Sequence, residues 1–118
     1  MKHIKAVRGD TLNIAVTNIV VELDDGSFYT FTETDRFTFA IGLPHKKPIL
    51  QKERPGEMQL VGDTLLVSFP PDETLSLQSL SYEFDCKLDF GGEGTNVYTI
   101  VHGELQMFET VAKMGGGG

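Results

Sequence analysis

Residues 81–90, Ser81-Tyr82-Glu83-Phe84-Asp85-Cys86-Lys87-Leu88-Asp89-Phe90, alternate polar and apolar side chains without interruption. A period of two puts the apolar residues on one face of an extended chain and the polar residues on the other. The stretch therefore predicts a half-buried β-strand. Gly91-Gly92-Glu93-Gly94 follows directly and predicts a hairpin loop that leads into another strand.

Shorter runs of the same kind precede this strand. Residues 11–17 alternate, and Arg8-Gly9-Asp10 before them predicts a turn or bulge. Residues 19–23 and 28–31 flank Asp24-Asp25-Gly26, and Asp-Gly between two such runs predicts an antiparallel hairpin. These segments indicate strands that begin early in the chain and are separated by turns.

The middle of the chain contains further strand patterns. Residues 36–41 place Phe37, Phe39 and Ile41 on one face of a strand. The stretch from Pro48 to Pro55 leaves room only for a short edge strand, because proline cannot donate to a ladder. Two runs, 58–61 and 64–69, flank Gly62-Asp63 and predict a second tight hairpin, which Pro70-Pro71 ends.

Two structures remain open for residues 72–77. They are a helical turn capped by Asp72 or Thr74, or a connection that crosses between sheets, and we favour the connection. Residues 95–101 and 104–108 predict a final hairpin around a turn at His102-Gly103.

No long amphipathic helix is predicted, and about eight or nine short strands in one domain are typical of a sandwich. We therefore predict an all-β protein with a small, antiparallel, immunoglobulin-like β-sandwich. Residues 1–112 form its single domain, and residues 113–118 form a flexible glycine-rich tail.

Composition excludes several classes of partner. Ten Lys and Arg against 17 Asp and Glu give a formal charge of −7, which repels nucleic acid and anionic lipid. No apolar run reaches the roughly 18 residues needed to span a bilayer, and the N-terminus lacks the apolar core of a secretion signal. We expect synthesis in a cytoplasm, with no nucleic-acid or membrane partner.

Most residues that suggest chemistry have a simpler structural explanation. Cys86 is the only cysteine and points inward, so we expect a buried thiol without a disulfide. His3, His45 and His102 are widely separated and lack partners at metal-ligand spacing. Glu83 and Asp85 share the polar face of a strand, where carboxylates are usually solvated.

Three short motifs also favour structure over chemistry. Arg8-Gly9-Asp10 leads into a strand, Asp24-Asp25-Gly26 lacks the spaced oxygen ligands of a calcium loop, and residues 91–94 do not lead into a helix as a phosphate loop does. We predict no enzyme activity, no catalytic or metal-binding residue and no cofactor.

The remaining candidates form a possible interaction surface. Exposed aromatic residues in strands whose faces cannot all be buried could contact a sugar or a protein. Loops with free surface could do the same. The predicted residues are Tyr29, Lys46, Lys47, Gly92, Glu93 and Tyr98.

Several segments together resemble one protein family. They are Arg8-Gly9-Asp10-Thr11-Leu12, Phe37-Thr38-Phe39-Ala40-Ile41, Tyr82-Glu83-Phe84-Asp85, Gly94-Thr95, Tyr98-Thr99-Ile100 and Gly103-Glu104-Leu105. The chain resembles the N-terminal β-sandwich domain of the baseplate upper proteins of phages and prophages that infect Gram-positive bacteria. The resemblance implies a structural virion or tail component that self-associates or binds a larger tail protein.

A second class of function stays open. An immunoglobulin-like or carbohydrate-binding module would have the same strands, but would carry several aromatic side chains on one solvent-facing surface. Tyr29, Tyr98 and one exposed Phe aligned on a single surface would favour that class, with carbohydrate as its ligand.

Overall fold

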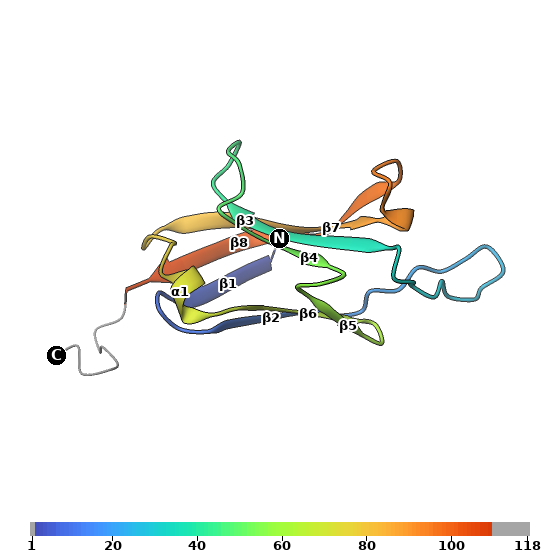
Figure 1. The fold of residues 1–118 in the computed structure, drawn as a ribbon, viewed down its shortest axis with the longest axis horizontal. Helices are drawn as coiled ribbons and strands as arrows, with labels where there is room; N and C mark the ends of the chain where they lie inside the picture. Colours follow the sequence, from blue (N-terminus) through green and yellow to red (C-terminus); the bar gives the residue numbers. More distant parts are fainter. Residues whose placement is uncertain (1, 110–118) are drawn as a thin grey trace.

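The computed structural model describes residues 2–109, which form two packed β-sheets (Figure 1). The larger sheet has the order β1-β8-β7-β3-β4 and the smaller β2-β6-β5. The strands are β1 Lys2–Val7, β2 Leu12–Val16, β3 Arg36–Gly42, β4 Leu50–Arg54, β5 Gln59–Val61, β6 Thr64–Phe69, β7 Ser81–Asp89 and β8 Val97–Phe108. The predicted all-β sandwich is confirmed. The predicted domain end at residue 112 and the tail at 113–118 lie outside the described residues.

The core lies between the inward faces of the two sheets. Strand β7 contributes Tyr82, Phe84, Cys86 and Leu88, all buried, so its predicted alternation is confirmed. Phe39 of the neighbouring β3 stacks on Phe84, with 5.6 Å between ring centroids. Burial of these side chains is the main source of stability, at roughly 25 cal/mol per Å² of apolar surface.

Several predicted local structures are also confirmed. Strands β5 and β6 pair around Gly62-Asp63, and β7 and β8 form a hairpin across the glycine-rich loop, which begins with a 3₁₀ turn η1 at Phe90–Gly92. The short strand β4 lies at the edge of the larger sheet, as the flanking prolines indicated. None of the described helices is long and apolar enough to cross a membrane.

The N-terminal strand β1 was not predicted, and it corrects the expectation of a wholly antiparallel sandwich. It pairs with β8 in parallel, from Lys2 beside Gly103 to Val7 beside Phe108. This edge of the larger sheet is only half covered, and Ile4 and Ala6 are therefore only partly buried against the core. For the same reason the polar and apolar residues of β1 alternate only weakly. The turn at Arg8-Gly9-Asp10 then carries the chain to the other sheet.

The predicted final hairpin at His102-Gly103 is wrong, because β8 is one continuous strand. Gly103 is instead required by a close approach inside the sheet. A Cβ at this position would collide with the Lys2 carbonyl oxygen and would lie 2.6 Å from the Phe84 ring. The glycine therefore makes room for β1 on one side and the core on the other.

Residues 17–35 do not form the two predicted strands. The Asp24-Asp25-Gly26 turn exists, and its two sides pair antiparallel over a short distance, through the Glu22–Phe28 bridge and the backbone bonds from Leu23 to Ser27 and from Tyr29 to Val21. Ile19 instead donates its backbone N–H to the carbonyl of Asp63. The segment is thus a long loop, here called the β2–β3 loop, that projects at the right of Figure 1.

Residues 70–80 connect the smaller sheet to the larger one, as favoured from the sequence, but they also contain the helical turn α1, Pro71–Thr74. Neither Asp72 nor Thr74 caps this turn through its side chain at the N-terminus. Pro71 at its first position is compatible with a helix start because that residue needs no hydrogen-bonded N–H.

Candidate functional site

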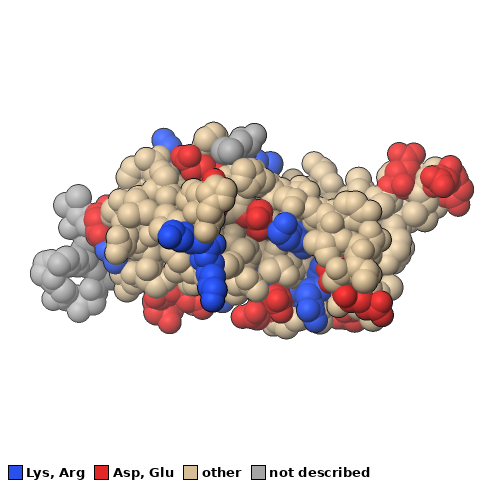
Figure 2. Space-filling view, turned by 90° about the horizontal axis from the view of Figure 1, so that it is seen from above, with Lys and Arg blue, Asp and Glu red and all other residues tan. Residues whose placement is uncertain are grey.

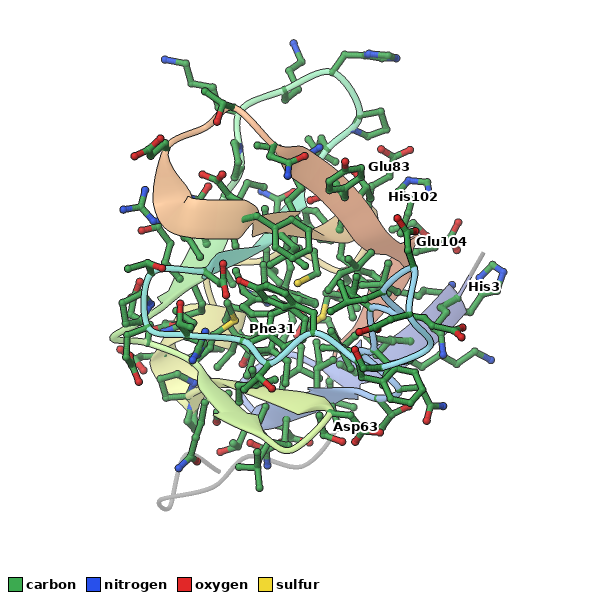
Figure 3. The ribbon with its side chains drawn as sticks, turned by 90° about the vertical axis from the view of Figure 1, so that its right-hand side faces the viewer. His3, Phe31, Asp63, Glu83, His102 and Glu104 are labelled. Carbon is green, nitrogen blue, oxygen red and sulfur yellow. The ribbon has the colours of Figure 1, made fainter. Side chains whose placement is uncertain are left out.

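Three loops meet at one end of the sandwich, here called the loop end. They are the β2–β3 loop, the β5–β6 turn and the loop between β7 and β8 at residues 90–96, here called the β7–β8 loop. Figure 3 faces this end, with Phe31 near its centre and Asp63 on the β5–β6 turn. The backbone bond from Ile19 to Asp63 and the contacts described below join the loops.

Asp35 fixes these loops in place. Its carboxylate is buried, with 1% of the residue exposed. It accepts hydrogen bonds from the Tyr29 hydroxyl and the Thr32 N–H at 2.9 Å each, and from the Gly91 N–H at 3.0 Å. Arg54 of β4 donates to the carbonyl oxygen of Asp35 at 3.0 Å. One carboxylate therefore ties the β2–β3 loop to the β7–β8 loop.

The ionisation of Asp35 follows from these contacts. Burial raises the pKa of its carboxyl group, but the hydrogen bonds from Thr32, Gly91 and Tyr29 outweigh burial and hold the pKa below its usual value. The hydrogen bond between Tyr29 and Asp35 also raises the pKa of the Tyr29 hydroxyl, because the hydroxyl must keep its proton to donate to the carboxylate. Asp35 is thus an anion that organises backbone N–H groups.

An aromatic cluster packs beside Asp35. Phe90 lies 5.3 Å from Tyr29 and 5.9 Å from Tyr98, measured between ring centroids, and both contacts are edge-to-face. Phe31 packs against Tyr29 at 5.3 Å and against Phe37 at 5.4 Å. The β2–β3 loop therefore covers core aromatics at the end of the larger sheet.

Apolar side chains at the loop end remain exposed. Phe28 is 61% exposed, Val20 56% and Tyr98 55%. A groove of about 400 Å³ opens beside the first two. Its lining residues are Ile19, Val20, Phe28, Tyr29, Thr30, Phe31, Arg54, Leu60, Gly62 and Asp63. Exposed apolar surface of this kind, on a fixed backbone, is typical of a protein-contact site.

The structure brings together four of the six predicted surface residues. Tyr29, Gly92, Glu93 and Tyr98 all lie at the loop end. Gly92 packs closely on the β2–β3 loop, since a Cβ there would lie 2.8 Å from the Thr34 carbonyl oxygen. Tyr29 is half-buried, so its role is mainly to support the loop.

Lys46 and Lys47 lie elsewhere, on the exposed loop at residues 43–49 between β3 and β4, here called the β3–β4 loop. Strand β3 begins at Arg36, next to the loop end, and this loop follows its other end (Figure 1). The two predicted groups of surface residues are therefore separated by the length of β3, and they do not form one site within a single copy.

Sequence reasoning missed Asp35 and Phe31. The partners of Asp35 include Gly91, which is 56 positions away in the chain, so no local pattern marks this carboxylate as buried. The only local signal is Thr32 three residues before it, whose N–H bonds to the carboxylate while its carbonyl accepts the Asp35 N–H. Such side-chain bonds to nearby backbone are common in turns.

A second polar group lies on the outer face of the larger sheet, where Figure 3 shows His3, Glu83, His102 and Glu104 along one side. Glu83 and Glu104 are directly opposite each other, and His3 Nδ1 lies 3.9 Å from a Glu104 carboxylate oxygen. Within residues 2–109 no group of three or more His, Cys, Asp or Glu side chains is arranged to hold a metal ion.

Cys86 is buried, as predicted. Burial, and secondarily the negative charge of Asp85, raises the pKa of its thiol to about 12. A thiol with so high a pKa stays protonated and is a poor nucleophile. Arg8 of the Arg-Gly-Asp turn uses its guanidinium to bind Glu109 and the Leu75 carbonyl oxygen. This arginine is therefore part of the scaffold.

Comparisons with known proteins add no relationship. No model of a known protein family matches the chain, and no curated protein matches it.

Proposed function

We propose that this chain is a non-enzymatic structural protein of a phage or prophage tail, which assembles through protein–protein contacts at its loop end. One observation carries the proposal. Phe28 and Val20 expose apolar surface on the β2–β3 loop, and Tyr98 at the start of β8, beside loops that Asp35 and Arg54 hold together. The tail assignment itself rests on the sequence resemblance, and the loop end supports the part of the proposal that concerns protein–protein contact.

A fixed apolar surface favours protein binding for a physical reason. Association costs free energy for every loop and side chain that must be ordered, at about 0.5–1.5 kcal/mol for each immobilised side chain. The bonds of Asp35 to Tyr29, Thr32 and Gly91 order the loops before any partner arrives. Aromatic residues such as Phe28 and Tyr98 then bury large areas with few rotatable bonds.

The titratable groups support a non-catalytic role. The shifted pKa values of Asp25, Tyr29, Asp35 and Cys86 all have structural causes, which are a turn, a loop anchor or core burial. Tyr29 and Asp35 contact each other, but the Asp35 carboxylate is buried and occupied by its hydrogen bonds, whereas a catalytic group must be open to its substrate.

The strand order supports an immunoglobulin-like assignment. When β2 to β8 take the letters B, C, C′, D, E, F and G in chain order, the sheets read G-F-C-C′ and B-E-D, as in variable-type domains. Tyr82, near the start of β7, accepts a hydrogen bond from the Gln78 N–H at 2.6 Å. A tyrosine that bonds to upstream backbone at this corner recurs in such domains.

The exposed aromatics also give a second candidate function, a carbohydrate-binding module. Tyr98 and Phe28 are the observation in its favour. Its support is weaker, because Tyr29 is half-buried and the rings around Phe90 meet edge-to-face at 75° and 89° instead of forming a flat platform. Glycan binding that Tyr98→Ala abolishes would favour this second function.

The tail proposal is tested on particles. After prophage induction of a host strain that encodes the chain, purified tail particles are analysed by quantitative mass spectrometry. We expect the chain at a fixed ratio to tail proteins, with its gene among tail genes. Phe28→Ser should lower its incorporation at least about tenfold, because the substitution removes apolar contact area from the partner surface.

Leu66→Ser is the matched control, since Leu66 is an exposed apolar residue on β6, at 41%, outside the loop end. Its incorporation should equal that of the wild type. Absence of the chain from particles, together with a gene that has no tail genes around it, contradicts the proposal.

A further inference from the structure

Charge is segregated between two exposed loops of this chain. The β2–β3 loop, residues 17–35, carries acidic side chains and no Lys or Arg, whereas the β3–β4 loop, residues 43–49, carries His45, Lys46 and Lys47 and no Asp or Glu. Figure 2 shows acidic side chains gathered at the outer end of the projecting loop. The two loops are thus opposite in sign, although the whole chain is acidic.

Asp35 is a buried anchor, and none of the other charged side chains of these two loops forms an ion pair within the described residues. The ion pairs among residues 2–109 are His3–Glu104, Arg8–Glu109 and Lys52–Glu73, and none involves Lys46 or Lys47. On the acidic loop, Asp25 hydrogen-bonds only within its own turn, to Ser27. Both loops therefore present charge that is free to meet an opposite charge from outside.

The two loops also match in apolar surface. Leu43 and Ile49 flank the lysines and are 39% and 43% exposed. On the acidic loop, Phe28 and Val20 line the groove of about 400 Å³, and Asp63 is also in its lining. Arg54 also lines the groove, but its guanidinium is bonded to the carbonyl oxygens of Thr32 and Asp35. Each surface thus combines apolar side chains with charge, and the charges of the two loops are complementary.

We infer that the groove at the loop end binds the β3–β4 loop of a second copy of this chain. Leu43 and Ile49 of one copy pack against Phe28 and Val20 of the other, and Lys46 and Lys47 face its acidic loop. The inference rests on the proposed assembly function and names one partner for it. Charge complementarity between the loops selects a second copy as the occupant.

The contact is head-to-tail, because two different surfaces meet. Within one copy the loops lie at opposite ends of β3, so they do not satisfy each other. Each copy keeps one free groove and one free basic loop, so the contact repeats into a ring or an open chain. A single contact is weak, since exposed ion pairs contribute about 0–1 kcal/mol, and closure of a ring adds stability because its last contact forms within the assembly.

Paired charge reversals test this contact. Glu22→Lys with Asp24→Lys reverses two charges of the acidic loop and brings the loop close to neutral while keeping the Asp25 turn, and Lys46→Glu with Lys47→Glu reverses the basic loop. Sedimentation velocity over a concentration series at low salt should show self-association of the wild type, weakened at least about tenfold in either variant. Mixing the two variants should restore association, because the unchanged basic loop of one variant meets the unchanged acidic loop of the other, and the substituted positions of the two altered loops also carry opposite charges.

The matched control for the basic-loop variant is Lys2→Glu with Lys5→Glu, which makes the same change in net charge on exposed positions of β1. Its self-association should stay within about threefold of the wild type, because Lys2 and Lys5 lie outside both loops of the proposed contact. Circular dichroism of every variant tests whether unfolding causes a loss of association. The mixing experiment is interpreted only for variants that are folded.

Two results would overturn the inference. One is a wild type that stays monomeric at every concentration, and the other is self-association that neither reversal weakens. Both would leave the tail assignment intact if the chain is found in particles. If the chain is also absent from particles, the proposed function fails as well.

Discussion

The two ends of the sandwich differ in the polar group that holds them together. Among the described residues, Asp35 and Thr74 are the buried polar or charged side chains, and each lies at a different end. Thr74 accepts the Gly9 N–H at 3.0 Å and donates to the Asp10 carbonyl oxygen at 2.8 Å, so it ties the β1–β2 turn to α1. Asp35 ties the β2–β3 loop to the β7–β8 loop.

The difference reflects what each end must satisfy. At the Thr74 end one N–H and one carbonyl face inward, and a hydroxyl can serve both as acceptor and as donor. At the Asp35 end several donors converge, from Tyr29, Thr32 and Gly91, and only a carboxylate has enough acceptor sites. A neutral anchor thus closes the compact end, and a charged anchor organises the end with exposed apolar surface.

Replacing the charged anchor should have the largest effect. Asp35→Ala leaves the donors of Tyr29, Thr32 and Gly91 without their acceptor, so we expect the free energy of unfolding to fall by about 3 kcal/mol. Urea denaturation measures this loss, and hydrogen exchange should accelerate at the Thr32 and Gly91 amides. A loss below about 1 kcal/mol would show that water replaces the carboxylate without cost.

Replacing the neutral anchor should cost less. Thr74→Val keeps the shape of the side chain but removes the acceptor of the Gly9 N–H and the donor to Asp10. We expect a loss of about 1–2 kcal/mol by urea denaturation, with faster exchange at Gly9 and no change at Gly91. Equal effects of Thr74→Val and Asp35→Ala would remove the distinction between the two ends.

The two anchors should also differ in how their contribution to stability depends on pH. The pKa of Asp35 is lower in the folded chain than in the unfolded one, so the folded state binds fewer protons. The stability that its ionisation provides is fully present above the usual Asp pKa of about 4, and it is lost as pH falls through the folded pKa. The stability difference between wild type and Asp35→Asn should therefore shrink below about pH 4.

The difference between wild type and Thr74→Val should not change over the same range, because a hydroxyl does not titrate there. The pKa of Asp25 is also lowered, by its bonds to Ser27, but Asp25 is present in every variant and its contribution cancels. A stability difference between wild type and Asp35→Asn that stays constant down to low pH would contradict an ionised Asp35.

Local patterns predicted most of the strands. The alternation of residues 81–90 predicted a strand, and the structure has β7 there from Ser81 to Asp89. The predicted hairpin around Gly62-Asp63 is also present. These predictions succeeded because a half-buried strand requires period-two alternation whatever its neighbours are. The six surface residues were partly predictable too, since Tyr98 and Glu93 are exposed at the loop end and both lysines are exposed on the β3–β4 loop.

The errors came from contacts between distant segments. Gly103 resembled a turn residue, but its role depends on Lys2 and Phe84, which pack against it from two sides. Residues 19–23 and 28–31 had the composition of strands, yet Ile19 bonds to Asp63 and Phe31 packs on Phe37 and Phe90. A propensity for extended structure does not specify which segment supplies the partner.

By itself the sequence determined an all-β chain with one core and an inward Cys86, because these depend on composition and on the period of neighbouring residues. Only the tertiary structure decided that β1 pairs in parallel with β8 and that Asp35 is buried beneath Tyr29 and Gly91. These features join residues far apart in the chain, and their energies exist only once the two sheets have packed.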